Sequence, residues 1–316
     1  MIQFHNMLES FVIMIALVVS AIWLRKRSTI LQHEQGVFGR LVTDFALPAL
    51  VFATLSKDPF SVAKLLPALL LLGSIAAVML VAWLIGRAMR LDKAVLGSVI
   101  LVAGVGSSST LGYSLIHRIF GNNPAVMSEV VIMGEFGVVL PLFSIGVAIA
   151  MYFGRDDAKK VSFWTASRPF FTSPLFVALV LGVVASMIGI PQENRAVRLF
   201  YAFMEVAGDS LALLVAFTIG LMLRPIAYRK IVRVIALVAV LKLIVEPLFA
   251  GSTALLLGVP TLERELLVIQ AGMPSGALAA VLAARYGCDG DVASAVLIAT
   301  YILSLVMLPL IVYISL

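Results

Sequence analysis

The sequence contains few charged residues, few histidines and almost no cysteine. Only 13% of its 316 residues are charged, whereas 62% are hydrophobic, and this balance excludes an ordinary soluble globular domain. Cys288 is the single cysteine, so one chain can build neither a disulfide framework nor a cysteine metal cluster. The three histidines lie between or at the ends of apolar runs, without the spacing of a metal site. We therefore expect no metal and no cofactor.

The sequence also lacks the motifs of common enzyme classes. No GxSxG, HExxH, Walker or dinucleotide-binding motif occurs at a usable position, and no nucleophile with a base lies within an apolar run. We expect that the protein is not an enzyme.

Its net charge of +6 comes from basic residues in short gaps between apolar runs rather than on one face. This placement indicates membrane topology and not a nucleic-acid partner.

Long apolar runs dominate the sequence instead. Each is about 20 residues long, which as a helix matches the hydrocarbon core of a bilayer. Most of the 23 Lys and Arg residues fall in alternate loops, so the positive-inside rule predicts that both termini face out. The predicted fold class is an all-α integral membrane protein with ten transmembrane helices, at residues 7–24, 37–55, 65–85, 95–116, 126–152, 170–190, 203–223, 231–257, 266–286 and 292–314.

The longest polar gap, residues 155–168, is the expected cytoplasmic linker between two halves, residues 1–154 and 169–316. Each half holds five expected spans. Because five is odd, the second half starts from the opposite side of the membrane, and the halves would be inverted repeats. The fourth and ninth spans are then symmetry mates. Internal similarity supports this division, because Leu47, Leu50, Val51 and Thr54 align with Leu211, Leu214, Val215 and Thr218, and Gly112 aligns with Gly276 at the same spacing.

Both of these mates contain helix-breaking residues. The ninth span reads QAGMPSGALAAVLAARY from Gln270, and Pro274 predicts a break because proline lacks an N–H. A Gly and Ser cluster predicts a second interruption in the fourth span. Backbone groups freed inside a bilayer need protein, water or a ligand, and a half-helix starting near Ser275 favours an anion. The alternative is that Pro274 only kinks a packed helix. The candidate substrate-binding residues are Gly106, Ser107, Ser108, Ser109, Gly112, Met273, Pro274, Ser275 and Gly276.

Acidic residues within the spans are candidates for binding a coupling ion. Asp44 lies four residues before Pro48, so its carboxylate and a carbonyl freed by the proline could bind a cation. The alternative is that Asp44, close to Arg40, is solvated near the inner interface. Glu135 is predicted to lie near the outer face and to be solvated.

The remaining candidates form charge pairs. Glu205 and Asp209 share one helix face, so a proton or a cation must neutralise them in a dry site. Lys242 has two alternative partners. These are Asp209 on another helix, at a similar depth, and Glu246, one helical turn further along its own helix.

Four stretches resemble the auxin efflux carrier family, which includes plant auxin exporters and bacterial organic-acid permeases. They are LPALVF at 47–52, LKL at 241–243, MPSG at 273–276 and the ending RYGCDGDVASAVLIATYILSLVMLPL at 285–310. The resemblance spans nearly the whole chain. It implies a crossover fold related to the bile acid sodium symporters, with a scaffold domain and a transport domain that carries crossed helices 4 and 9. The sequence departs from the family in the fourth span, where Ser107 and Ser114 stand at positions of an Asn and a Pro, beside a retained Gly112.

The expected function is secondary active transport of small organic anions such as carboxylates, by alternating access, with the substrate at the crossing of helices 4 and 9. The expected location is a bacterial inner membrane, with the lipid bilayer as partner and H⁺ or Na⁺ as the coupling ion. A homodimer is one assembly that the sequence leaves open. The alternatives are a sodium-coupled bile-acid-type symporter and a membrane sensor that binds a ligand without transporting it.

Overall fold

The computed structural model describes residues 2–31, 34–58, 61–121, 123–154, 164, 168, 171–190, 194–222 and 231–315. The chain forms two compact units. Unit 1 comprises Met1–Lys64, Ser109–Val131 and Arg168–Leu223, and unit 2 comprises Leu65–Ser108, Ile132–Ser167 and Arg224–Leu316. Each unit draws on both halves of the sequence, so the units do not coincide with the expected repeats. The inverted repeat therefore stays a prediction, and most of the expected linker lies outside the described residues.

Unit 1 is held together by apolar helix faces. α3 packs against α10 and α11, and α12 packs against α1 and α2. The close approach of α10 to α3 depends on Gly182, where a Cβ would lie 3.0 Å from the Cβ of Leu55. The helices of unit 1 are α1 (Ile2–Lys26), α2 (Gln35–Leu41), α3 (Leu47–Lys57), α6 (Tyr113–Phe120), α10 (Pro174–Ile188), α11 (Arg195–Asp209) and α12 (Leu211–Met222).

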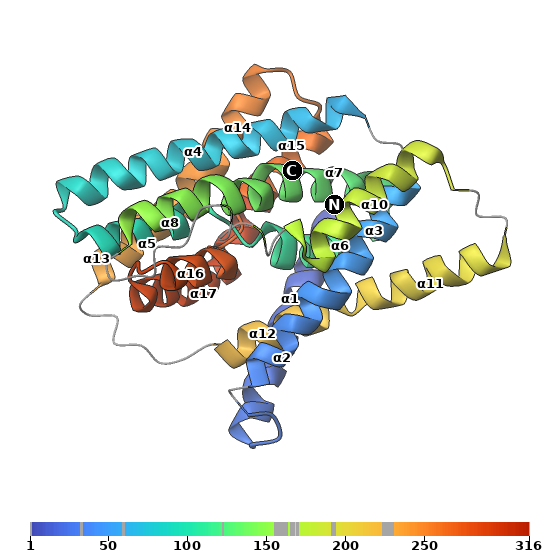
Figure 1. The fold of residues 1–316 in the computed structure, drawn as a ribbon, viewed down its shortest axis with the longest axis horizontal. Coiled ribbons are helices and arrows are strands. Elements are labelled where there is room, and N and C mark those ends of the chain that lie inside the picture. Colours follow the sequence, from blue (N-terminus) through green and yellow to red (C-terminus); the bar gives the residue numbers. More distant parts are fainter. Residues whose placement is uncertain are drawn as a thin grey trace. The chain divides into compact units, whose positions relative to one another are not determined.

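Unit 2 contains the whole of the ninth expected span and the part of the fourth that ends at Ser108. α5 packs against α4, α16 and α17, and α14 packs beside α15 (Figure 1, orange). The helices of unit 2 are α4 (Leu65–Ala88), α5 (Lys93–Gly104), α8 (Val147–Phe153), α13 (Val232–Val240), α14 (Glu246–Leu256), α15 (Thr261–Ala271), α16 (Ala277–Arg285) and α17 (Gly290–Ser315). α7 (Pro124–Gly134) contains one of the boundaries between the sequence segments of the two units.

Prolines widen several helices without ending them. Three π-helical turns, Val42–Ala46, Glu135–Val139 and Leu241–Val245, each stop two residues before a proline, namely Pro48, Pro141 and Pro247. Proline offers no N–H to the carbonyl four residues before it, and a π turn shifts the bonding so that the helix continues. A proline in this sequence therefore predicts a change of helical winding more often than a break.

Six helical stretches of the described chain are long and apolar enough to cross a membrane: Gly36–Lys57, Leu65–Ala88, Pro124–Phe153, Arg195–Leu221, Val232–Leu256 and Gly290–Ile311. They coincide with six of the ten expected spans. Of the other four, α1 has 25 residues and α10 has 15, while the fourth and ninth spans are each divided into shorter helices. The protein is thus an all-helical membrane protein over its described residues, and the number ten remains a prediction.

Candidate functional site

Two helices of unit 2 are interrupted in the segments that the sequence singled out. α5 ends at Gly104, and an extended segment follows until the π turn η4 (Ser108–Gly112). α15 ends at Ala271, and α16 begins at Ala277. The intervening residues 105–107 and 272–276, called the two break segments below, are all buried. Their backbone groups therefore need hydrogen-bond partners outside their own helices.

The two break segments supply those partners to each other. Gly106 and Ser275 form an antiparallel β-bridge, so two short pieces of strand pair between helix ends. The flanking hydrogen bonds run from the Ser107 N–H to the Pro274 carbonyl and from the Gly276 N–H to the Val105 carbonyl, both at 2.8 Å. This pairing gives hydrogen-bond partners to backbone N–H and C=O groups that would be costly to leave unpaired in an apolar surrounding.

Glycine makes the close approach of the two segments possible. A Cβ at Gly276 would lie 2.8 Å from the backbone oxygen of Gly106. A Cβ at Gly106 would lie 2.9 Å from Nζ of Lys242. A larger residue at Gly276 would therefore force the two segments apart, whereas one at Gly106 would displace the end of the Lys242 side chain.

Helix α17 braces the break segments through two polar side chains. The Thr300 hydroxyl accepts a hydrogen bond from the Ser275 N–H at 3.2 Å, and the Tyr301 hydroxyl lies 2.6 Å from the Ser107 hydroxyl. Ser275 also donates its own hydroxyl to the Val102 carbonyl at 2.6 Å. Sequence reasoning did not assign Thr300 and Tyr301 to the site, although a polar pair in a long apolar run is a signal that could have found them.

Lys242 lies directly behind the break segments. Its side chain is 1% exposed, and Nζ lies 2.6 Å from Oε2 of Glu246, which is fully buried. The same ammonium group donates to the carbonyl of Gly104 at 3.2 Å. That carbonyl belongs to the last turn of α5, where helical partners end. Of the two partners predicted for Lys242, the structure has Glu246. Asp209, in unit 1, lies beside His117 instead.

Some buried polar groups at the site have no hydrogen bond within the described part of the chain. They are the Ser108 hydroxyl and Oε1 of Glu246. The N–H groups of Ala277 and Leu278, in the first turn of α16, also have no partner among the described residues. Donors at a helix N-terminus, a free hydroxyl and a buried ammonium form a chemical environment suited to a carboxylate.

The predicted substrate residues divide between the two units. Unit 2 holds Gly106, Ser107 and Ser108 together with the buried stretch from Met273 to Gly276. Ser109 and Gly112 are buried within η4 but fall in the segment that belongs to unit 1. Of the predicted substrate-binding residues, those that the structure brings together are therefore the residues of the two break segments.

The acidic candidates of unit 1 have partners within that unit. Glu205 forms an ion pair with Lys57, and Asp209 lies 3.6 Å from Nε2 of His117. The Glu205 and Asp209 side chains are 40% and 53% exposed, and both line a small cavity of about 40 Å³. The two carboxylates on one helix face are thus neutralised separately, the second only when the imidazole is protonated.

Asp44 and Glu135 differ in their surroundings. Asp44 is exposed in unit 1, and its carboxylate accepts a hydrogen bond from the Thr43 hydroxyl at 2.9 Å. Glu135, which we predicted to be solvated, is fully buried in a π turn that packs against α4. That prediction is wrong because the distance along a helix fixes depth but not the side that a residue faces.

Comparisons with known proteins relate the sequence to membrane transporters. Residues 4–154 and 161–312 match the sequence profile of a family described as "Membrane transport protein". A protein of Methanothermobacter thermautotrophicus, described as an uncharacterized transporter, is 28% identical over 97% of this chain and 98% of its own length. A second uncharacterized transporter, from Methanocaldococcus jannaschii, is 25% identical over 93% of this chain and 95% of its own length.

Proposed function

Because the chain belongs to the membrane transport protein family that contains the auxin efflux carriers, we propose that it is a secondary transporter of small organic anions such as carboxylates. The substrate binds where the fourth and ninth spans cross. The observation that carries this proposal is the antiparallel pairing of the two break segments around Gly106 and Ser275. Paired interruptions in a helical membrane protein are typical of midplane substrate sites.

Each part of the proposed site has a separate role. The N–H groups at the start of α16 and the Ser108 hydroxyl donate hydrogen bonds to the substrate carboxylate. Lys242 adds positive potential behind the break segments, and its bonds to Gly104 and Glu246 keep the end of α5 in place. Tyr301 orients Ser107 through their hydroxyl contact. These groups prefer an anion over a cation or a neutral solute.

The division into two compact units supports a mechanism of alternating access. In our proposal, unit 2 carries the substrate, and unit 1, which holds the exposed Asp44 together with Glu205 and Asp209, is the scaffold. A proton on Asp209 or His117, or a sodium ion near Asp44, is the candidate coupling event. The proposed location is a bacterial inner membrane with both termini outside.

Uptake into liposomes tests the proposal. Purified protein is reconstituted, and the entry of labelled malate, malonate and indole acetate is followed under an imposed proton or sodium gradient. We expect saturable uptake of at least one acid. Ser108→Ala removes a buried hydroxyl that has no hydrogen-bond partner among the described residues, so it should raise KM several-fold while the protein folds normally.

A matched variant separates substrate binding from packing. Ser74→Ala removes another buried hydroxyl of unit 2, one that donates to the Leu71 carbonyl within α4, and it should leave uptake unchanged. Uptake that depends strictly on sodium would identify the bile-acid-type symporter as the better description. Saturable binding of an acid without any flux would contradict transport and identify a sensor.

A further inference from the structure

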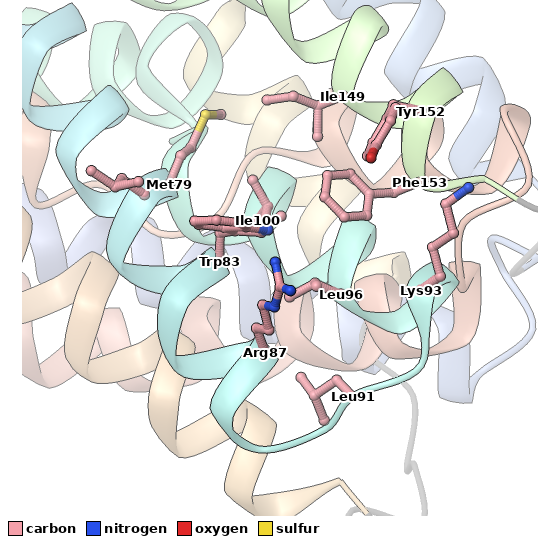
Figure 2. Close-up of a pocket in the computed structure, with 11 residues that line it drawn as sticks. Met79, Trp83, Arg87, Leu91, Lys93, Leu96, Ile100, Ile149, Tyr152 and Phe153 are labelled. Carbon is pink, nitrogen blue, oxygen red and sulfur yellow. The ribbon is translucent and has the colours of Figure 1, made fainter.

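A second cavity in unit 2 lies away from the break segments. It has a volume of about 630 Å³ and is formed by the end of α4, the start of α5 and the end of α8. Figure 2 shows that the side chains of Trp83, Arg87, Lys93 and Phe153 line this cavity, here called the α4–α8 cavity. The break segments do not contribute to it, so the proposed transport site does not account for it.

The lining of the cavity divides into a charged part and an apolar part. Arg87 and Lys93 are exposed cations, whereas the rest of the wall is apolar or aromatic and includes Leu80. Ile100 and Ile149 are part of this apolar wall (Figure 2). An elongated ligand with an anionic end and a hydrocarbon body matches this division. A small hydrophilic anion would use only the charged part.

The two cations are held by aromatic rings and not by carboxylates. The Arg87 guanidinium lies 5.7 Å from the centre of the Trp83 ring, and Nζ of Lys93 lies 5.2 Å from the centre of the Tyr152 ring. Neither side chain forms an ion pair with another described residue. Their positive charge is thus oriented by cation–π contact and remains available to an anion.

The position in the chain places this cavity at the cytoplasmic surface of the bilayer. Arg87, Arg90 and Lys93 lie in or beside the loop between α4 and α5, one of the lysine- and arginine-rich loops that the positive-inside rule assigns to the cytoplasm. Trp83 and Tyr152 are the residue types that gather at the headgroup level of a membrane. Basic pockets between helices on this side are suited to anionic lipid headgroups.

We propose that the α4–α8 cavity binds an anionic glycerophospholipid of the inner leaflet, with its phosphate between Arg87 and Lys93 and an acyl chain along Leu80, Ile100 and Ile149. α5 continues from this cavity to the break at Gly104. The lipid would therefore hold the N-terminal end of a helix whose C-terminal end forms part of the proposed substrate site. This inference does not depend on the identity of the transported anion.

Quenching of tryptophan fluorescence by brominated lipids tests the proposal. The chain has three tryptophans, so Trp23→Phe combined with Trp164→Phe leaves Trp83 as the reporter. The protein is placed in phosphatidylcholine vesicles that contain either brominated phosphatidylglycerol or brominated phosphatidylcholine. We expect brominated phosphatidylglycerol to occupy the cavity beside Trp83, and so to quench its fluorescence, with on the order of tenfold preference over brominated phosphatidylcholine. The reason is that two cations contribute to binding of the anionic headgroup. The Arg87→Gln and Lys93→Gln double variant should abolish that preference.

The control variant is Arg90→Gln. Arg90 is an exposed cation of the same loop that does not line the cavity, so its loss should leave the preference largely intact. Equal quenching by the two lipids would overturn the proposal. An equal loss of preference in Arg90→Gln would also overturn it, because general surface charge would then explain the effect. Relief of quenching by soluble glycerol phosphate or malate would instead identify a site for small anions and would equally exclude a lipid site.

A second measurement does not depend on the reporter. A ligand that binds only the folded protein raises its melting temperature. Phosphatidylglycerol added to the protein in detergent should raise the melting temperature of the parent and of Arg90→Gln, but not that of the double variant. A rise of equal size in all three proteins would contradict the proposed site.

Discussion

Lys242 and Glu246 are two charges buried one helical turn apart, and each depends on the other. Removing one member leaves an uncompensated charge, which costs about 3 to 5 kcal/mol. We therefore predict that Lys242→Met or Glu246→Leu alone lowers the melting temperature in detergent strongly. The double variant should recover most of the loss, because an apolar pair avoids the desolvation of both charges.

The same variants separate structure from transport. The double variant should fold but should not transport the anion, because the positive charge behind the break segments is gone. Single variants that are as stable as the double variant would show that the two charges are not coupled. A double variant with normal uptake would show that Lys242 has no electrostatic role in transport.

Cys288 is a second residue with an unusual environment. Its Sγ lies 3.5 Å from the Ala150 carbonyl, and a Cβ at Gly97 would lie 2.7 Å from it. Burial, and then the negative charge of Asp289, raise the pKa of the Cys288 thiol to about 11, while Lys93 opposes the shift. The reactive thiolate is therefore scarce at neutral pH and increases only as the pH approaches that value.

We predict that maleimide labels Cys288 at pH 7.5 about two orders of magnitude more slowly than an exposed cysteine with a pKa of about 8.5. The rate should rise about tenfold with each pH unit up to the thiol pKa. The reference is Asp291→Cys in a Cys288→Ser background, at an exposed position nearby. Equal labelling rates at the two positions would show that the thiol is accessible and unshifted.

At the scale of residues, the sequence identified polar groups more reliably than their partners. Lys242 was singled out because charged groups are rare in these spans, and Ser107 and Ser275 because they lie in the predicted helix interruptions. The bond between Lys242 and Gly104, and the bonds from Thr300 and Tyr301 to the break segments, join residues far apart in the chain. Helical periodicity indicates which residues share a face, but it does not reveal which helix lies opposite.

The pairing of the two break segments restricts substitution at the helix ends. Gly276→Ala would place a methyl group 2.8 Å from a backbone oxygen, so the segments must separate. We predict a loss of about 1 to 3 kcal/mol in stability, as for other overpacked sites, together with a loss of uptake. Melting in detergent and liposome uptake measure the two effects.

Gly73→Ala is the matched control for this variant. Gly73 lies within α4, and a Cβ there would have no neighbour within 4 Å. Alanine favours a helix over glycine by roughly 0.5 to 1 kcal/mol, so this variant should be as stable as the parent or more so. If the two alanine variants behave alike, the close approach at Gly276 does not matter.

Prolines show how far the sequence predicts individual helices. Pro274 was expected to break its helix, and the structure has a break between Ala271 and Ala277, where freed backbone groups pair with the other break segment. Pro48, Pro141 and Pro247 instead follow π turns within continuing spans. The choice between a break and a change of winding therefore depends on the neighbouring helices, which the local sequence does not contain.

The membrane topology gives a prediction for the whole molecule. If each half crosses the membrane five times, the gap at 155–168 lies on the opposite side from both termini. Alkaline phosphatase should then be active when fused after Leu316 and inactive when fused within the gap. Green fluorescent protein should show the reverse pattern. The same side for both fusion points would exclude inverted halves.

Composition and the apolar runs were enough to predict an all-helical membrane protein, because hydropathy acts on every residue of a span. They were not enough to predict the compact units, since both units combine segments from the two halves of the sequence. Which helices pack together depends on small residues such as Gly182 and Gly276, whose contacts are long-range. Linear order therefore predicts the helices better than it predicts their grouping.

The bonds that join the two break segments also bear on how this protein can evolve. They run between main-chain atoms, and apart from the two glycines that permit the approach they make no demand on side-chain chemistry. Mutations that change the other side chains around the pairing, such as Ser108, can therefore alter which solute the proposed site recognises while the architecture persists. A lineage built on this fold could acquire new solutes by a few point substitutions, without a new scaffold.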